Sequence, residues 1–387
     1  MAAFLALAAV FAGGATRIVQ DQCGPFTDVT PAFCPYILEL YYLGVTAGTS
    51  ATTFSPDDPL TRGQGSVFVA KGLNQALARS SRPAALGQWW TTTPHWDLGL
   101  GVTSLDEGIR QVVSDGTDLW VIRAGTVYRV RASDGRLLET WTGAAGGYGL
   151  LAAMGRIFVA GTNGGAVTEG TPGVLYMIDP GQPAGPVTTV ATGIGNNPID
   201  LAFDGSRIWV TNPVVPGGSS VAIVTPASSA PWPVTTVTAG FSLPMGITFD
   251  GTNVWVADPA LGDLLRLDAD GAVTQSVHTT TNQFIAFDGA NLWVPNPNSV
   301  TVVRALDGAI VATLSGNGVS GGNAVAFDGQ RVLVTSPNAD TISFWNAADL
   351  QPLGFVSTGT ASLPYFVCSD GLNFWISLGG FGQLVRF

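Results

Sequence analysis

The strongest pattern in the chain is an apolar run, an Asp-Gly pair, two polar residues and a second apolar run that contains tryptophan. Four copies are nearly identical: "VVSDGTDLWV" (112–121), "LAFDGSRIWV" (201–210), "ITFDGTNVWV" (247–256) and "IAFDGANLWV" (285–294). Three more are degenerate: "LAAMGRIFV" aligns with Met154 at the aspartate position and one residue fewer, "VAFDGQRVLV" has Leu333 in place of tryptophan, and "FVCSDGLNFWI" lies near the C-terminus. Seven copies with a period of about 40 residues predict a repeat architecture such as a propeller.

Each Asp-Gly pair joins two short β-rich runs and therefore predicts a hairpin turn in which glycine supplies a positive φ. Two more strand-like runs follow each tryptophan, as in "DLLRLDAD" and "GAIVATLSG". Four strands per repeat and seven repeats predict a mainly β fold, a seven-bladed β-propeller.

The last repeat stops at "QLVRF", after its third strand. The segment "DLGLGVTS" (97–104) precedes the first repeat in the place where a fourth strand would lie. We therefore predict that it pairs with the final blade and closes the ring over residues 97–387.

The recurring aromatic position could form either an exposed binding surface or the packing between blades. We favour packing, because one large side chain at a fixed point of every second strand can bury on the order of 200 Å² against the next blade. This position holds Trp120, Trp209, Trp255, Trp293 and Trp375, with Phe158 and Leu333 as substitutes. With these features, residues 97–387 resemble the YVTN/NHL-type β-propellers, whose relatives include virginiamycin lyase-like proteins.

A different, partly helical pattern precedes the repeats. "PYILELYYLG" places Ile37, Leu40 and Tyr41 on one face of a helix, and Thr61 is a predicted N-cap of a second helix with a following apolar stripe. That stripe consists of Val67, Phe68, Leu73 and Leu77.

The segment "FTDVTPAF … ILELYYLGVTAGT … TFSPDDPLTRGQ" resembles the S-layer homology module, and we assign residues 23–80 to a single such module. Modules of this family hold exported proteins on a wall polymer, and the arginine of their T-R motif belongs to the contact. The resemblance makes Thr61 and Arg62 the candidate wall-polymer-binding residues. A guanidinium can pair with the acidic groups of a glycan, although an ion pair with Asp57 or Asp58 is an equal alternative.

The sequence departs from this family in two ways. Gln64 stands where an acidic residue is usual, and one module is present where wall-binding members normally carry three. A cap or an oligomer contact is therefore an alternative role for the single copy.

The first residues, "MAAFLALAAVFAGGA", have the apolar run and small-residue end of a secretory signal, so we assign residues 1–22 to a signal peptide and short lead. A basic region is missing from its start, which leaves room for a start further upstream. In an exported protein, Cys23 and Cys34 are close enough to form a disulfide, and Cys368 remains as a buried, unreactive thiol. Residues 81–96 form a linker whose Trp89, Trp90 and Trp96 pack on the propeller in preference to binding sugar.

The charge balance excludes some partners. The net charge is −11 and Lys71 is the single lysine, so the chain has no basic surface for nucleic acid. No apolar segment reaches the length of a transmembrane span. The two histidines, His95 and His278, lie in no catalytic motif, and no cofactor or metal motif is present.

One candidate ligand site remains in the propeller. Polar residues follow the tryptophan strand in five blades, where the loops should converge at the mouth of the central channel. They are simple turn residues or a ring of oxygens for a polar ligand or Ca²⁺. The five are Asn163, Asn212, Asp258, Asn296 and Ser336.

These features favour a non-enzymatic, exported cell-envelope or cell-surface protein. Its partner would be a cell-wall glycan or an envelope protein, and its propeller would be a binding or scaffold platform. The alternatives are a hydrolase or lyase with a metal at the channel mouth, and a propeller that packs against its own copies in a surface layer.

Overall fold

The computed structural model describes residue 23 and residues 25–30, 33–42, 45–78, 102–132, 135–163, 171–214, 217–280, 283–371 and 373–387. The chain divides into two compact units, residues 1–91 and 92–387. We describe each unit by itself. The proposed signal peptide, the linker with its three tryptophans and the predicted domain boundaries at residues 80 and 96 lie outside the described residues.

The N-terminal unit contains two helices, α1 (Cys34–Tyr42) and α2 (Arg62–Ala78). Phe26 is buried at its centre, where its ring lies 5.2 Å from that of Tyr41 and 5.7 Å from that of Phe54. Gly48 leaves room for this ring, because a Cβ there would lie 2.4 Å from Phe26. The Cys23–Cys34 disulfide predicted from the sequence is present.

Asp28, which precedes α1, is hydrogen-bonded to the segment between α1 and α2. Its carboxylate accepts hydrogen bonds from the backbone N–H groups of Phe54 (2.9 Å) and Ser55 (2.7 Å). The bond from Phe54 is the main cause of a lowered pKa of Asp28. The aspartate of the "FTDV" motif thus fixes the position of the "FSP" motif.

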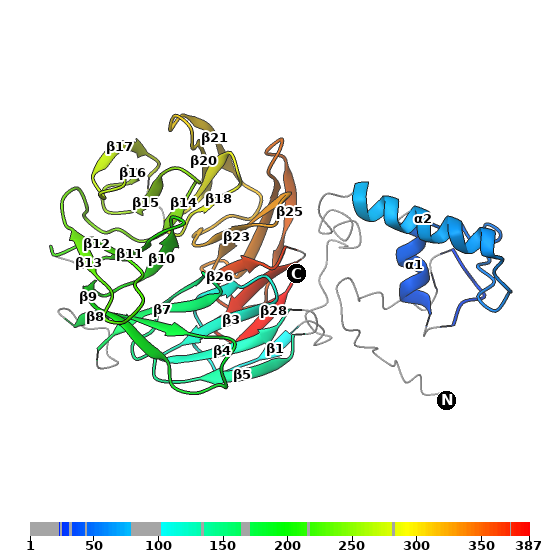
Figure 1. The fold of residues 1–387 in the computed structure, drawn as a ribbon. Helices are drawn as coiled ribbons and strands as arrows, with labels where there is room; N and C mark the ends of the chain where they lie inside the picture. Colours follow the sequence, from blue (N-terminus) through cyan, green and yellow to red (C-terminus); the bar gives the residue numbers. More distant parts are fainter. Residues whose placement is uncertain are drawn as a thin grey trace. The chain divides into compact units, whose positions relative to one another are not determined.

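The second unit is a propeller of seven four-stranded antiparallel sheets around a central axis (Figure 1). The innermost strand of each sheet contacts those of the two neighbouring sheets, so the ring is closed. Blade 1 is formed by β2 (Val112–Ser114), β3 (Asp118–Arg123), β4 (Thr126–Arg131) and β5 (Leu137–Trp141). Blade 2 is formed by β6 (Gly149–Ala153), β7 (Arg156–Thr162), β8 (Pro172–Ile178) and β9 (Thr188–Asn196).

Blades 3 to 6 follow the same order from the inner to the outer strand. Blade 3 contains β10 (Asp200–Phe203), β11 (Ile208–Asn212), β12 (Ser220–Val224) and β13 (Val234–Val237). Blade 4 contains β14 (Ile247–Phe249), β15 (Val254–Asp258), β16 (Asp263–Leu267) and β17 (Val273–His278). Blade 5 contains β18 (Ala286–Phe287), β19 (Asn291–Pro295), β20 (Ser299–Arg304) and β21 (Ile310–Ser315). Blade 6 contains β22 (Val325–Phe327), β23 (Arg331–Ser336), β24 (Thr341–Asn346) and β25 (Pro352–Ser357).

Blade 7 combines the two ends of the propeller chain. It contains β26 (Pro364–Ser369), β27 (Phe374–Leu378) and β28 (Gln383–Arg386), and β1 (Val102–Ser104) is its outer strand. β1 pairs with β28 in the register Val102 to Val385. The predicted closure is confirmed, because an N-terminal strand supplies the missing fourth strand.

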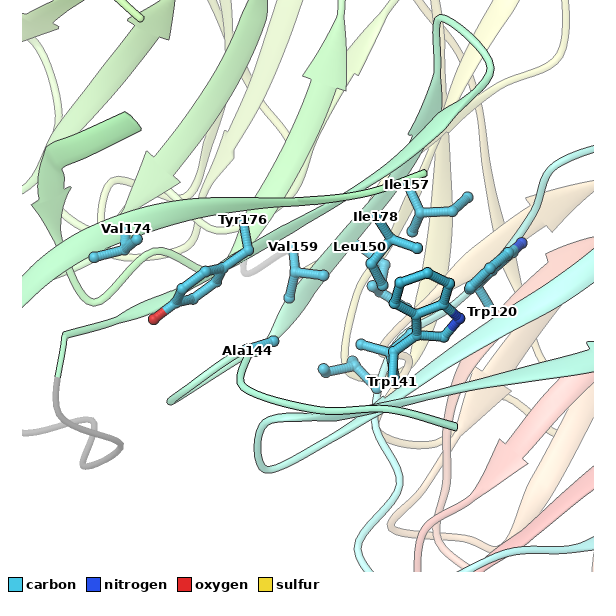
Figure 2. Close-up of a cluster of buried hydrophobic side chains, with 11 residues drawn as sticks. Trp120, Trp141, Ala144, Leu150, Ile157, Val159, Val174, Tyr176 and Ile178 are labelled. Atoms are coloured by element: carbon cyan, nitrogen blue, oxygen red, sulfur yellow. The ribbon is translucent and has the colours of Figure 1, made fainter. Parts of the chain in front are cut away.

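The recurring aromatic residues lie between blades, as predicted. The five tryptophans are at most 1% exposed, and Phe158 and Leu333 are fully buried. Trp120 of blade 1, for example, packs against Leu150, Ile157 and other apolar residues of blade 2 (Figure 2). The repeat therefore encodes the interfaces of the ring.

The turn aspartate binds the tryptophan of its own repeat, a role that the sequence analysis did not foresee. One carboxylate oxygen accepts the indole N–H, and the other accepts backbone N–H groups of the turn, such as those of Thr117 and Asp118 onto Asp115. Five repeats share the indole bond: Asp115–Trp120 (2.8 Å), Asp204–Trp209 (2.8 Å), Asp250–Trp255, Asp288–Trp293 and Asp370–Trp375 (2.7 Å each).

The strand register corrects the alignment of the second repeat. Leu151 pairs with Phe158 and Ala153 with Arg156, so Ala153 occupies the aspartate position and no residue is missing. Met154 therefore occupies the glycine position, with φ +54°. Phe158 has no indole N–H, so this blade lacks both members of the hydrogen-bonded pair.

Candidate functional sites

Thr61 and Gln64 close the N-terminus of α2. The Thr61 hydroxyl accepts the backbone N–H of Gln64 (3.2 Å), and the Gln64 side chain accepts the backbone N–H of Thr61 (2.9 Å). This reciprocal pair is a capping box, which confirms Thr61 as the N-cap. Gln64, the departure from the family pattern, is the N3 residue of this capping box, a position that glutamine and glutamate can both fill.

Arg62 is the first residue of α2 and is exposed. Among the ion pairs of the described residues, none joins Arg62 to Asp57 or Asp58. The guanidinium therefore faces solvent, in a position where it can meet an external anion. Its role in wall-polymer binding stays a prediction.

The predicted apolar stripe of α2 is wrong at one position. Val67 is 52% exposed, and the neighbouring Val69 is 72% exposed. Phe68 is half-buried, while the side chains of Leu73 and Leu77 lie outside the described ones. The pattern failed at Val67 because helical spacing gives a face but not the partner that covers it.

The five polar residues predicted at the channel mouth lie at the end of the second strand of their blades or directly after it. Four are buried and hydrogen-bonded within their own blade or to the connection that leads into it, and Asn163 is exposed. No hydrogen bond joins any two of these five described residues. Asn212, fully buried against Gly195, has a side-chain oxygen without a hydrogen-bond partner.

Asp258 shows the structural role of this position most clearly. Its carboxylate accepts the backbone N–H groups of Ser242 (2.7 Å) and Leu243 (2.9 Å) in the connection from β13 to β14. Ser336 likewise accepts the N–H of Ser320 (3.3 Å), and the Asn296 amide donates to Thr301 (2.9 Å). These bonds fix loops, and a ligand-binding role for the five residues remains untested.

A central cavity of about 230 Å³ lies elsewhere, between the seven inner strands. None of the five predicted residues lines it. Its wall is mainly aliphatic, with a few polar and aromatic side chains at one level. The lining comprises Gln111, Val112, Val113, Ser114, Leu150, Leu151, Asp200, Leu201, Ile247, Phe284, Ile285, Ala324, Val325, Phe366, Val367 and Cys368.

One side of the cavity is polar. Asp200 begins β10, and its carboxylate accepts the side-chain N–H of Gln111 (2.8 Å) and the backbone N–H groups of Ile247 (3.0 Å) and Leu201 (3.0 Å). Gln111 in turn accepts the backbone N–H of Leu150. This chain of hydrogen bonds joins blades 1 to 4 around the axis. Burial raises the pKa of Asp200 to about 6, against the lowering effect of these bonds.

The opposite side is aromatic. The rings of Phe284 and Phe366 lie 4.7 Å apart at the strand position that Gln111 and Asp200 occupy in their own blades. The Tyr148 ring lies 6.1 Å from Phe366, and the guanidinium of Arg110 lies 4.5 Å above Tyr148. Burial raises the pKa of Tyr148, so this phenol stays neutral at physiological pH.

Cys368 and His278 have no evident place in a catalytic arrangement. Cys368 lines the cavity and is half-buried, where the sequence predicted a buried thiol; burial still raises the pKa of this thiol well above the usual value, which disfavours the reactive thiolate. His278 lies on the outer strand β17, mostly exposed, 2.9 Å from Asp263; His95 lies outside the described residues. Within the described part of the chain, no three His, Cys, Asp or Glu side chains are grouped as metal ligands.

Comparisons with known proteins agree with both parts of the chain. Residues 25–64 match the S-layer homology domain. An endoglucanase of Bacillus sp. (strain KSM-635) is 41% identical over 70 residues, which are 18% of this chain and 7% of that enzyme. The match thus spans a small fraction of the relative, and it concerns neither chain as a whole.

The propeller resembles solved structures at low sequence identity. Virginiamycin B lyase from Staphylococcus aureus has a TM-score of 0.58 and 16% identity over 74% of this chain and 98% of that one. The WD40 β-propeller domain of Doa1 has a TM-score of 0.58 and 13% identity over 74% and 95%. Such likeness shows the fold alone.

S-layer homology domains bind cell-wall polymers, which implies a cell-surface or envelope location. Among the described helices, neither is long and apolar enough to cross a membrane. The chain thus carries an S-layer homology domain at residues 25–64 and a seven-bladed β-propeller that resembles virginiamycin B lyase in fold.

Proposed function

We propose that this chain is a non-enzymatic, exported protein of the cell envelope, attached through its S-layer homology domain and carrying the propeller as a binding or scaffold platform. The domain match over a folded, disulfide-closed unit is the observation that carries this proposal. The apolar segment at residues 1–22 would direct export, which agrees with the disulfide.

Arg62 is the proposed contact to an acidic group of the wall polymer. The capping box of Thr61 and Gln64 fixes the start of α2, so the guanidinium leaves the helix at a defined point. The helix N-terminus adds a favourable field for the same anion. A cell-wall glycan with carboxylate, phosphate or pyruvyl groups fits this chemistry.

We favour binding over catalysis for the propeller. The nucleophilic side chains that line the cavity with Asp200 are Ser114 and Cys368, and no histidine or lysine of the described lining is placed to activate either one. His278 is paired on an outer strand, away from the inner strands. A metal-dependent hydrolase or lyase would need a ligand group that these described residues do not form.

The test is binding of the full chain to purified cell-envelope fragments, measured as the bound fraction at increasing protein concentration. Arg62→Ala should weaken binding by about 10-fold or more, because a charge-assisted bidentate pair contributes about 1.5–3 kcal/mol. Arg62→Lys keeps the positive charge but loses the planar guanidinium, so its binding should be weaker than that of the unchanged protein and stronger than that of Arg62→Ala.

Lys71→Ala is the matched control, since it removes one exposed positive charge from the same helix. It should bind like the unchanged protein. Equal loss in both variants would mean that net charge governs attachment, and full binding by Arg62→Ala would remove Arg62 from the contact. If the unchanged chain fails to bind, the attachment proposal fails.

A further inference from the structure

We propose that the central cavity of the propeller binds a small organic ammonium ion, of the kind represented by choline or tetramethylammonium. This inference rests on the proposed role of the propeller as the ligand-binding part of the chain, and it is independent of how the chain is attached. Three features of the cavity carry it: its charge, its aromatic side and its volume.

The charge of the cavity is uncompensated. Asp200 is the only charged residue in the described lining, and it is 5% exposed. Its three hydrogen-bond donors, from Gln111, Ile247 and Leu201, are all neutral. A buried carboxylate without a counter-ion is costly, so a cation that enters the cavity gains a strong partner.

The aromatic side selects an organic cation. Phe284 and Phe366 line the same cavity as Asp200, and aromatic faces attract ammonium groups. Aliphatic side chains form most of the remaining wall, which suits the methyl groups of a quaternary ammonium. A hard metal ion needs about six or more oxygen ligands, whereas the side chains of this lining offer oxygens only from Gln111, Ser114 and Asp200.

The cavity is also large enough for such an ion. Gly149 and Gly246 occupy the position of Asp200 in the two neighbouring blades, so these positions place no side chain in the cavity. A Cβ at Gly149 would lie 2.5 Å from the backbone oxygen of Ile199, and one at Gly246 would lie 2.5 Å from that of Gln283, so the glycines let the inner strands approach one another closely. The total volume of about 230 Å³ exceeds the roughly 150 Å³ of an engineered cavity that accepts benzene.

The charged and titratable groups near Asp200 leave this site negative. Arg110 lies on the ring of Tyr148 and does not line the cavity, and Tyr148 stays neutral. Cys368, the other titratable group of the lining, is held as a neutral thiol. Ammonium binding should therefore follow the ionisation of Asp200 and weaken as the pH falls below 6.

Titration calorimetry of the full chain at pH 8 can test this with choline chloride and its neutral isostere 3,3-dimethyl-1-butanol, against sodium chloride. We expect choline to bind at least about 10-fold more tightly than the isostere, since the two differ in charge and hardly in shape. Asp200→Asn should remove this difference, and Phe284→Leu should reduce it. Asp340→Asn is the control, because Asp340 accepts the N–H groups of Ala361 and Leu363 and does not line the cavity.

Three outcomes would overturn the proposal. Equal affinity for choline and its isostere would show an apolar cavity without a cation site. Displacement of choline by equimolar sodium would assign the site to an inorganic ion. Lack of saturable choline binding by the folded protein would leave Asp200 as a purely structural residue, and envelope binding measured on the same preparation would show that the attachment proposal stands or falls separately.

Discussion

The hydrogen bond between the turn aspartate and the buried tryptophan makes a sharp prediction about the stability of the ring. In blade 4, Asp250 accepts the indole N–H of Trp255 at 2.7 Å and the backbone N–H groups of Thr252 (2.7 Å) and Asn253 (2.6 Å). Trp255 is fully buried, so Asp250→Ala leaves its N–H without an acceptor. We expect this change to lower the free energy of unfolding by about 2–3 kcal/mol, most of it from the orphaned indole N–H.

A double-mutant cycle of Asp250→Ala with Trp255→Phe measures the share of this free energy that comes from the indole N–H. Phenylalanine has no N–H to satisfy, so the aspartate should matter much less in its presence, and the two changes should be coupled by about 1.5–2 kcal/mol. Blade 2 agrees with this expectation, because Ala153 and Phe158 replace the aspartate and the tryptophan together, which leaves no indole N–H without an acceptor. Guanidinium-induced unfolding of the full chain, followed by circular dichroism, measures the four free energies.

Asp268→Ala provides the control for the turn itself. Asp268 also accepts two backbone N–H groups, those of Asp270 and Ala272 at 2.9 Å, and it lies on a different hairpin of the same blade. It should cost about 1 kcal/mol or less, because the freed N–H groups are exposed to water. Additive effects of Asp250→Ala and Trp255→Phe within about 0.5 kcal/mol would refute the reasoning.

Three further predictions follow from the closure, the cavity and the disulfide. Thr103→Pro should destabilise the propeller by about 3 kcal/mol, because proline cannot donate a backbone hydrogen bond from β1 to β28. Thr103→Val loses only the hydroxyl bond to the backbone oxygen of Gly135 and should cost about 1 kcal/mol. Thermal unfolding compares the two, and similar melting temperatures would contradict a role for strand pairing. Because the folded pKa of Asp200, about 6, lies above its unfolded value of about 3.9, lowering the pH from 6 to 4 should stabilise the unchanged protein relative to Asp200→Asn by about 2 kcal/mol; parallel pH profiles of the two proteins would refute this. Replacement of Cys23 and Cys34 by serine should destabilise the N-terminal unit by about 2–4 kcal/mol without moving the propeller transition, as calorimetry of the two transitions would show; a shift of the propeller transition would contradict this.

The propeller could be predicted from the sequence because its interfaces repeat. Each blade must turn tightly and bury a large side chain against its neighbour, and both demands leave the same residues at the same spacing. The closure by β1 was also predictable, since a ring of antiparallel blades leaves no stable end unless a strand fills it. The one alignment error fell on Met154, where a non-glycine residue holds a positive φ that sequence spacing cannot reveal.

In the N-terminal unit, the features that depend on contacts between nearby residues were predicted, and the burial of the second helix, which depends on the segment that covers it, was not. The cap at Thr61 and the disulfide follow from nearby residues, so the spacing was sufficient. The exposure of Val67 depends on what covers the second helix, and no helical pattern contains that information.

The central cavity was not predicted, because its lining residues do not repeat from blade to blade, whereas the residues that revealed the fold do. Packing positions repeat because every interface has the same task, but a ligand at the axis meets all blades at once, so each blade can contribute a different group. Gln111, Asp200, Phe284 and Phe366 occupy the same strand position in four blades, where the other three have glycine or alanine. The signal was therefore the variation among copies at one inner position, whereas the polar residues after the second strand recurred because they fix the same loop in each blade. In a repeat ring, recurrence identifies structural positions, and the axial position at which the copies disagree is where a specific site should be sought.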